Sequence, residues 1–263
     1  PDLKCEFYRI RSEYRVAALM LILNRIYTES RESRKSVKKG RGGDPLTIVF
    51  TATRHHVDYL QELLCASGYQ AAGVYGAMDQ EARTLALQSF RDGTKPILVV
   101  TDLAARGLDI PMLDYVINVD MPPTGKLFIH RVGRAARAGR TGTAYSVCSV
   151  DELPYYVDLA RHLNLIPNDN ISTLEQHNLD TISAQVKAMH EHSAALPALH
   201  RVMTNACKQY VASRPTASND AYALAKKLPV CDQSDDLLTA IHNYNPTGTV
   251  LTSRVKVDTQ NMN

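Results

Sequence analysis

The stretch TIVFTATRHHVDYLQELLCASGYQAAGVY, residues 47–75, decides the fold of this chain. It begins with the short apolar run TIVFT, which is typical of a strand buried on both faces. A helix is predicted over residues 54–67, because Val57, Leu60 and Leu64 recur at helical spacing and a glycine follows. The run AAGVY then predicts a second strand. A strand, a helix and a second strand of these lengths are the repeating unit of a parallel sheet.

The same alternation continues along the chain. Asp79 is a favourable N-cap, and a further helix is expected from there to about residue 93. Apolar runs predict three more strands, at residues 97–101, 115–119 and 143–149. Short strands that alternate with helices predict an α/β fold with helices on both faces of a parallel sheet. Ligands of such sheets bind at the carboxyl ends of the strands.

A basic segment, HRVGRAARAGR at residues 130–140, follows one of these strand ends. Its five basic side chains are His130, Arg131, Arg134, Arg137 and Arg140, and no acid occurs from residue 121 to residue 150. Three-residue spacing predicts that the first three arginines share one side of a helix. Planar guanidinium groups that face one way suit the phosphates of a nucleotide. A merely solvated basic face is the weaker interpretation, because two glycines interrupt the segment and glycine in a helix costs about 1 kcal/mol.

The flanking regions are predicted from the same signals. Residues 13–28 are expected to be helical, and residues 29–45, with six Lys or Arg, three Gly and a Pro, are expected to form a surface loop. Asp151 is expected to cap a helix over 151–164, and a polar linker follows. Residues 197–213 are predicted to be helical, with a stripe of Leu199, Val202, Met203, Ala206 and Tyr210, and a short helix is expected from Ser218. These helices are expected to pack on the sheet domain; an exposed docking face is the alternative.

Composition excludes several classes of protein. The chain of 263 residues is 44% hydrophobic and 22% charged, with a net charge of +3, so any affinity for nucleic acid must come from the local arrangement of charge. Five scattered cysteines without C-x-x-C spacing predict neither a disulfide framework nor a zinc site. The longest apolar run, residues 16–23, is too short to span a membrane.

Four motifs together resemble those of the DEAD-box ATP-dependent RNA helicases. HRVGRAARAGR resembles the sixth motif, TDLAARGLDI (101–110) the fifth, and TIVF the fourth, while residues 80–83 resemble the Q-x-x-R element. The segments HHVDYL, YGAMDQEAR and QYVASRPTAS (209–218) resemble a nucleolar subfamily that acts in assembly of the large ribosomal subunit. The resemblance implies a RecA-like helicase C-terminal domain over 1–163 with a basic insertion at 29–45, a linker over 164–178, and a helical extension and tail over 179–263.

The resemblance also implies the cofactors. The phosphate-binding pattern G-x-x-x-x-G-K-[ST] and the sequence D-E-A-D do not occur in this chain. The chain, which starts at a proline, is therefore expected to be the second of two RecA-like domains. ATP would lie in the cleft between the domains, and the first domain would hold Mg²⁺ and the phosphates. The expected partners are pre-rRNA, the N-terminal RecA-like domain and ribosome-assembly proteins. The expected localisation is the nucleus, in the nucleolus.

Site residues follow by matching positions in the family motifs. Arg134 and Arg137 match the arginine fingers that act on the γ-phosphate, and Asp109 matches the residue that binds the ribose. His130 and Arg131 match residues that couple the ATP site to the RNA site, and the resemblance implies that both, together with Gly107, take part in binding ATP. The resemblance implies that the following residues bind the RNA backbone: Gln80, Arg83, Thr101, Arg106 and Gly107. For Arg83, an ordinary exposed helix charge is the alternative.

Two other functions remain open at this point. The chain could belong to a DEAD-box helicase of mRNA export or translation, or it could be a non-catalytic module that binds RNA or protein. Arg134 and Arg137 argue against the module, because a protein without turnover does not need them. The segment QYVASRPTAS favours the ribosome-assembly branch.

Overall fold

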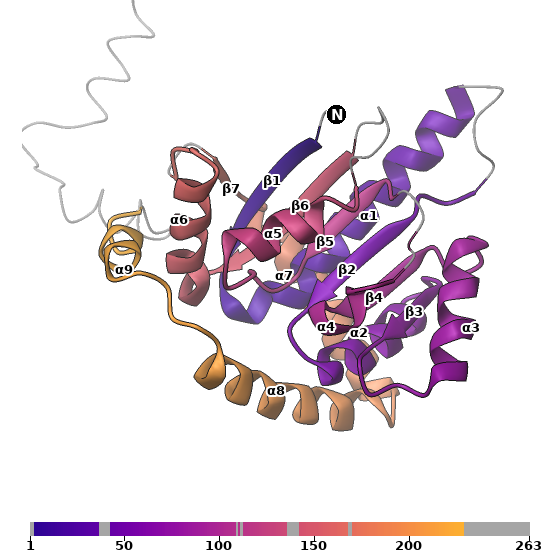
Figure 1. Ribbon diagram of the computed structural model, residues 1–263. Coiled ribbons are helices and arrows are strands. Elements are labelled where there is room, and N and C mark those ends of the chain that lie inside the picture. Colours follow the sequence, from indigo (N-terminus) through magenta and orange to yellow (C-terminus); the bar gives the residue numbers. More distant parts are fainter. Residues whose placement is uncertain are drawn as a thin grey trace, which may run out of the picture. The chain divides into compact units, whose positions relative to one another are not determined.

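Seven parallel strands form one sheet in the computed structural model (Figure 1). The structure describes residues 3–36, 43–108, 110, 113–135, 142–167 and 170–228, with side chains in α1 described as far as residue 32. The strands are β1 (Leu3–Ile10), β2 (Thr47–Thr51), β3 (Ala71–Val74), β4 (Ile97–Thr101), β5 (Tyr115–Asn118), β6 (Gly142–Ser149) and β7 (Ile171–Thr173). Their order in the sheet is β3-β4-β2-β5-β6-β1-β7. The predicted α/β class with a parallel sheet is confirmed.

The helices follow the strands in alternation. They are α1 (Arg15–Ser36), α2 (Arg54–Ala66), α3 (Gln80–Arg91), α4 (Asp102–Ala105), α5 (Gly125–Val132), α6 (Leu153–His162), α7 (Gln176–His192), α8 (Leu196–Ser213) and α9 (Asn219–Ala225), with 3-10 turns at Ser12–Tyr14 and Val150–Glu152. Every residue of β2, β3 and β4 is buried, as continuous apolar runs predict for strands covered on both faces. The five strands predicted from the sequence are all present.

One long strand escaped the sequence analysis. β1 pairs with β6 along its whole length and with β7 on its other side. Charged residues interrupt its apolar pattern, which is why periodicity did not reveal it. Lys4 and Glu6 form an ion pair of 2.6 Å within the strand, and Glu6 also lies 3.5 Å from Nη1 of Arg25 in α1. The neighbouring side chain of Phe7 is buried and packs on the rings of Phe128 and Tyr156.

The expected linker at 164–178 contains ordered structure. β7 lies within it and extends the sheet beside β1, and α7 begins at Gln176. The chain up to Lys227 forms one compact unit, without a break at residue 163. Pairing with the edge of β1 supplies the backbone hydrogen bonds of this polar segment, a long-range effect that composition does not reveal.

Two further local expectations differ from the structure. Residues 29–36 continue α1, where a loop was expected; Arg, Lys and Glu favour the helix, and a salt bridge between Arg25 and Glu29 (2.9 Å) supports it. Residues 37–42 of the basic insertion lie outside the described residues, and residues 43–45 belong to neither a helix nor a strand. The turn before α6 begins at Ser149, not at Asp151, because Glu152 reaches back to the amide of Ser149 (3.3 Å) in a capping box.

The helices α8 and α9 pack on the sheet domain, as expected, and so does α7, which the sequence analysis did not identify. α7 packs against α1, α8 against α2 and α9 against α6, and Figure 1 shows α8 crossing the base of the molecule. Leu196 at the start of α8 is completely buried, and Leu199 and Met203 pack against the main core. Val202 differs from the predicted stripe, because 42% of its surface is exposed.

A ring cluster joins these helices to α2 and predicts a pH dependence. The hydroxyl of Tyr59 lies 3.0 Å from Nε2 of His190, and the ring of His200 lies 5.3 Å from both rings. Burial, with a contribution from the charge of His200, lowers the pKa of His190. Since its pKa is lower in the folded than in the unfolded state, where it is about 6.5, folding is favoured above that pH. This stability is lost as the pH falls through the folded-state pKa.

We therefore expect amide exchange in α7 and α8 to accelerate between about pH 7 and pH 5, measured by mass spectrometry and corrected for intrinsic exchange. The variant His190→Gln should flatten this dependence. The matched variant His177→Gln, at an exposed position of α7, should retain it. A pH profile that is the same in all three proteins would contradict the assignment.

Candidate functional site

The carboxyl ends of β2, β4 and β5 meet at one edge of the sheet. Thr51 pairs with Thr101, and Phe50 pairs with Asn118, so these strands end almost in register. The loop after β2, the short helix α4 and the loop before α5 therefore lie next to one another. The predicted fourth and fifth motifs are brought together at this edge, where ligands of parallel sheets bind.

α5 carries the first part of the basic segment to this edge. The Thr124 hydroxyl accepts a hydrogen bond from the amide of Leu127 and caps the helix. The helix ends at Val132, so Arg134 lies in the turn after it and does not share one helix with Arg131, as had been predicted for both. Gly133 explains the end: a Cβ atom at this position would lie 2.9 Å from the carbonyl oxygen of Ile129. Its missing side chain allows the close backbone approach that the sequence suggested.

Arg131 is completely buried and links α5 to α4. Its Nε and Nη2 atoms donate to the two carboxylate oxygens of Asp102, at 2.6 and 2.7 Å. Its Nη1 donates to Oδ1 of Asn118 (3.1 Å) and to the carbonyl oxygen of Asp120 (2.8 Å). The guanidinium also lies 5.2 Å from the centre of the Phe50 ring. Arg131 therefore faces the interior, where it positions α5, and does not share the solvent side with the next arginine.

His130 and Arg134 lie on the solvent side of the same segment. His130 is exposed and Arg134 is half-exposed, and Nη2 of Arg134 lies 3.1 Å from Nε2 of His130. An arginine N–H can only donate, so Nε2 of His130 is the acceptor in this pair. The histidine thus orients the guanidinium from the helix that precedes it. Arg137, Arg140 and Asp109 lie outside the described residues.

The Q-x-x-R element is attached to α4. The Asp79 carboxylate accepts hydrogen bonds from the amides of Glu81 and Ala82, which starts α3 at the predicted N-cap. From the first turn of α3, Nη2 of half-buried Arg83 donates to the carbonyl oxygen of Ala104 (3.1 Å). Arg83 is therefore more than an exposed helix charge, because it fastens α3 to α4. Gln80, one turn before it, is exposed.

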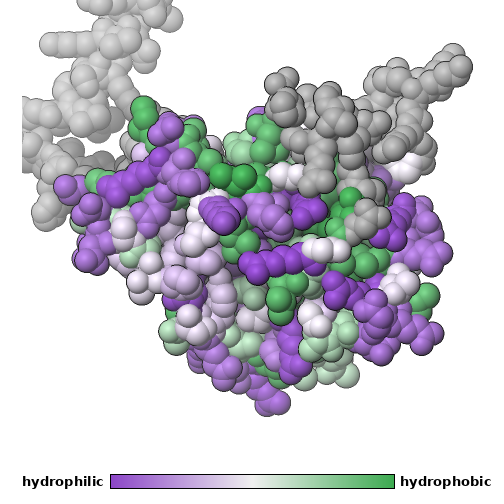
Figure 2. Space-filling model, in the orientation of Figure 1, coloured by the Kyte–Doolittle hydropathy of each residue, from purple (hydrophilic) through white to green (hydrophobic). Residues whose placement is uncertain are grey.

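The remaining predicted residues surround α4. Thr101 is buried, and its hydroxyl caps α4 by accepting from the amide of Ala104 (3.4 Å). Arg106 and Gly107 are exposed, and Gly107 has a φ of +72°, a conformation that favours glycine. Leu103 is 70% exposed beside them. Figure 2 shows hydrophilic and hydrophobic residues interspersed on the face that it presents.

Sequence reasoning missed two acids of the site, Asp102 and Asp120. Each follows a predicted strand directly, and an acid at the carboxyl end of a buried strand was the available signal. Asp120 is buried; its Oδ2 accepts from the amide of Ala52 (2.9 Å), and its Oδ1 lies 3.1 Å from Nη1 of Arg15. Burial alone would raise the pKa of Asp120, but the charges of His56 and Arg15 outweigh burial and hold that pKa below its usual range.

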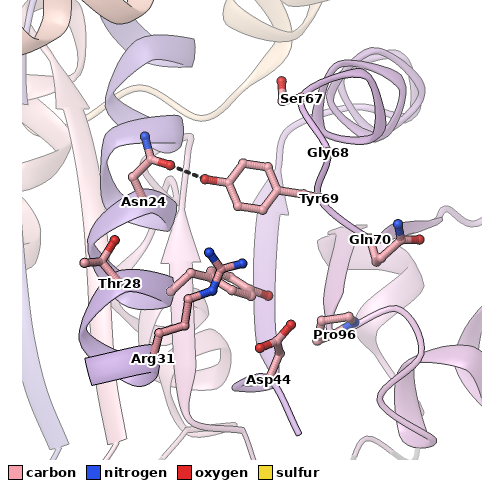
Figure 3. Close-up of a pocket in the computed structure, with 10 residues that line it drawn as sticks. Asn24, Thr28, Arg31, Asp44, Ser67, Gly68, Tyr69, Gln70 and Pro96 are labelled. Carbon is pink, nitrogen blue, oxygen red and sulfur yellow. Dashed lines mark hydrogen bonds between the residues drawn. The ribbon is translucent and has the colours of Figure 1, made fainter. Parts of the chain in front are cut away.

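A cavity of about 270 Å³ lies away from this edge (Figure 3). Asp44, Gln70 and Pro96, which precede β2, β3 and β4, line it, so it lies at the amino ends of these strands. The hydroxyl of Tyr69 donates to Asn24 across its rim. None of the predicted site residues that the structure describes lines this cavity. Among the described residues, no cluster of three or more His, Cys, Asp or Glu could hold a metal ion, and no helix has the length and apolar character to cross a membrane.

Comparisons with known proteins agree with this geometry. The family model of the helicase conserved C-terminal domain matches residues 34–139. The mouse protein named ATP-dependent RNA helicase DDX54 is 38% identical over 248 residues, which cover 88% of this chain and 27% of that protein. ATP-dependent RNA helicase DBP10 of Cryptococcus neoformans var. neoformans is 37% identical over 233 residues, which cover 87% of this chain and 29% of that protein.

A solved structure shows the same fold. A chain in the crystal structure of the E. coli DEAD-box protein SrmB, bound to regulator of ribonuclease activity A, matches with a TM-score of 0.54 and 30% identity. The match covers 68% of this chain and 94% of that chain, whereas the chain spans less than a third of the two curated relatives. With its RecA-like sheet and the motifs gathered at one edge, the chain belongs to the DEAD-box RNA helicases and contains their conserved C-terminal domain.

Proposed function

We propose that this chain forms the C-terminal half of an ATP-dependent RNA helicase and completes its ATP site. One observation carries the proposal: Arg131 holds α5 against α4 while His130 and Arg134 face solvent at the carboxyl edge. A fixed frame with a guanidinium at its surface suits charge that develops on a phosphoryl group of ATP. The mouse and fungal relatives are both named ATP-dependent RNA helicases.

The side chains present fit a nucleotide phosphate. ATP with Mg²⁺ supplies the phosphoryl group that is transferred to water, and an N-terminal RecA-like domain would hold the metal. Arg134 would present its fork to the γ-phosphate, as would Arg137. His130 would hold the Arg134 guanidinium by accepting its Nη2–H, and Asp109 would bind the ribose. Since Arg131 already makes four hydrogen bonds inside the domain, its contribution to ATP binding would be the placement of these neighbours.

RNA would bind beside the same frame. The exposed side chains of Gln80 and Arg106, and the exposed backbone at Gly107, provide polar groups suited to phosphate and 2′-hydroxyl contacts. Thr101 and Arg83 would shape this surface by fixing α4, because both bond to the backbone of Ala104. The chain has no Trp and only four Phe, so base stacking would contribute little and binding would be largely independent of sequence.

We also place the protein in nucleolar assembly of the large ribosomal subunit, with pre-rRNA and ribosome-assembly proteins as partners. Two observations support this: the identity to DDX54 extends over 88% of the chain, and the subfamily segment QYVASRPTAS is anchored in the fold. Crosslinking of the full-length protein to RNA in cells tests the proposal. Recovery of pre-rRNA would support it, whereas recovery chiefly of mRNA would favour a helicase of export or translation.

The test of the enzymatic proposal compares two proteins. The full-length protein should hydrolyse ATP with Mg²⁺, and RNA should stimulate it. The 263-residue chain alone should show no turnover, because its sequence contains no phosphate-binding loop. Release of inorganic phosphate is the measurement, with heat-denatured protein as the blank. A full-length protein that binds RNA but shows no hydrolysis would indicate the non-catalytic module instead.

A further inference from the structure

Six charged residues of alternating sign form a connected row from the C-terminal extension to α4, through side-chain contacts and one backbone carbonyl oxygen, that of Asp120. In order they are Arg214, Glu152, Arg15, Asp120, Arg131 and Asp102. Glu152 lies 3.3 Å from Nη1 of Arg214 and 2.9 Å from Nη1 of Arg15. Arg15 lies 3.1 Å from Asp120, whose carbonyl oxygen accepts from Arg131 at 2.8 Å. The row therefore ends at the two residues that fix α5 on α4.

The row is shielded from water along most of its length. The side chains of Arg214 and Glu152 are 5% and 4% exposed, that of Asp120 is 4% exposed, and that of Arg131 is fully buried. Salt screens such pairs only weakly. Removal of one member leaves its neighbour as an incompletely compensated buried charge, which must find new partners by moving. Loss of a charged side chain at one end of the row can therefore displace the next member, because the two are in direct contact.

Arg214 comes from the segment QYVASRPTAS, which the proposed ATP and RNA sites do not use. Its guanidinium lies 4.1 Å from the centre of the Tyr155 ring and 5.9 Å from that of Tyr210. The Tyr155 hydroxyl donates to the carbonyl oxygen of Pro215 at 2.9 Å. These contacts hold the end of α8 against α6 and direct Arg214 towards Glu152.

Glu152 connects this anchor to the loop after β5. Its Oε1 accepts from the amide of Met121 (3.2 Å) as well as from Arg214. Met121 directly follows Asp120, so the loop is held both by its backbone amide and by the Asp120 carboxylate. The same loop supplies the carbonyl oxygen that binds Arg131. The end of α8 thus acts on the peptide that orients the guanidinium of Arg131.

We propose that Arg214 and Glu152 are positioning residues for the carboxyl edge of the sheet. Through these two residues, the docked C-terminal extension sets the orientation of α5. Their contacts fix the 119–121 loop, this loop fixes Arg131, and Arg131 fixes the helix that carries His130. The consequence for catalysis rests on the proposed ATPase function. The structural coupling does not, so the two can be tested separately.

The chain offers a matched control for loss of the anchor. Asp158 on α6 holds the same extension, because its carboxylate accepts from the amide (2.7 Å) and the hydroxyl (2.6 Å) of Ser218. In the part of the chain that the structure describes, Asp158 forms no hydrogen bond or salt bridge with the six members of the row, and it lies outside the proposed sites. Asp158→Asn therefore loosens the extension near α9 without breaking the row, whereas Arg214→Gln breaks the row at its end.

Hydrogen exchange of the 263-residue chain tests the coupling directly. Arg214→Gln should make the amides of α5 exchange about tenfold faster, as expected for loss of a hydrogen bond between charged groups. Arg214→Lys should restore most of the protection of α5 against exchange. Asp158→Asn should accelerate the exchange of amides in α9 alone. Unchanged exchange of α5 in Arg214→Gln, equal acceleration in Asp158→Asn, or acceleration that extends equally to β2 would each overturn the proposal.

Steady-state kinetics of the full-length protein then test the consequence. Arg214→Gln should lower kcat for RNA-stimulated hydrolysis by about tenfold and leave KM for ATP within about twofold. The reason is that α5 carries His130, which orients the Arg134 guanidinium towards charge that is greatest in the transition state. Asp158→Asn should match the unmodified protein. A kcat for Arg214→Gln equal to that of Asp158→Asn would remove the positioning role. If the unmodified protein shows no hydrolysis, the proposed function fails, and the exchange experiment still decides whether the coupling exists.

Discussion

Replacement of Arg134 by alanine in the full-length protein is expected to lower kcat for ATP hydrolysis by about 10³–10⁵, the range observed for arginine fingers. The fork of Arg134 lies at the carboxyl edge and is oriented by His130, where it can meet charge that develops on the γ-phosphate. Because this charge is greatest in the transition state, the loss should appear in kcat and much less in the affinity for ATP. Arg137→Ala should behave in the same way.

Two further variants sharpen this experiment. Arg134→Lys keeps the charge but loses the planar fork, so it should lie between the alanine variant and the unmodified protein. Arg161→Ala removes an exposed arginine from the last turn of α6, far along the chain from the motifs, and should leave the rate unchanged. RNA-stimulated release of phosphate is the measurement. If Arg134→Ala retains turnover within about tenfold of the unmodified protein, Arg134 is not a finger.

Replacement of Asp102 by alanine is expected to destabilise the chain by about 3–5 kcal/mol. The substitution leaves the fully buried guanidinium of Arg131 without its bidentate partner, at distances of 2.6 and 2.7 Å in the native fold. Asn118 and the carbonyl oxygen of Asp120 cannot neutralise its charge. Since 25% of the Asp102 side chain is exposed, entry of water should place the effect at the lower end of this range.

The salt bridge between Arg25 and Glu29 provides the matched control. It is also an arginine–carboxylate pair, at 2.9 Å, but about half of each side chain is exposed. Glu29→Ala should therefore cost less than about 1 kcal/mol. Urea unfolding of the two variants, with the dependence on urea fitted separately for each, measures both values. Equal losses of stability in the two variants would show that burial of Arg131 does not matter.

Local sequence signals predicted much of the fold. Apolar runs identified β2, β3, β4, β5 and β6, and helical spacing with Asp79 as N-cap located α2 and α3. These signals act between residues a few positions apart, so the sequence reveals them directly. β1 was missed because charged residues interrupt its apolar pattern, and β7 was missed because only pairing with the neighbouring strand makes it a strand.

In the candidate site, too, some features follow from the local sequence and others only from packing. Motif positions in the sequence identified His130, Arg131 and Arg134, but not which of them faces solvent. Packing of α5 on the sheet decided that, since it buries Arg131 against Asp102, 29 residues away, and leaves Arg134 at the edge.

The sequence by itself determined the class of fold, the family motifs and the helices α8 and α9 of the extension, because periodicity, capping and motif spacing are local properties of a chain. Only the tertiary structure revealed which charged residues meet in the buried row from Arg214 to Asp102. Arg15 contacts a carboxylate 105 residues away and Arg214 one that is 62 residues away, across elements that sheet order alone brings together. Ion pairs between such distant positions depend on topology and burial, which no local pattern of residues specifies.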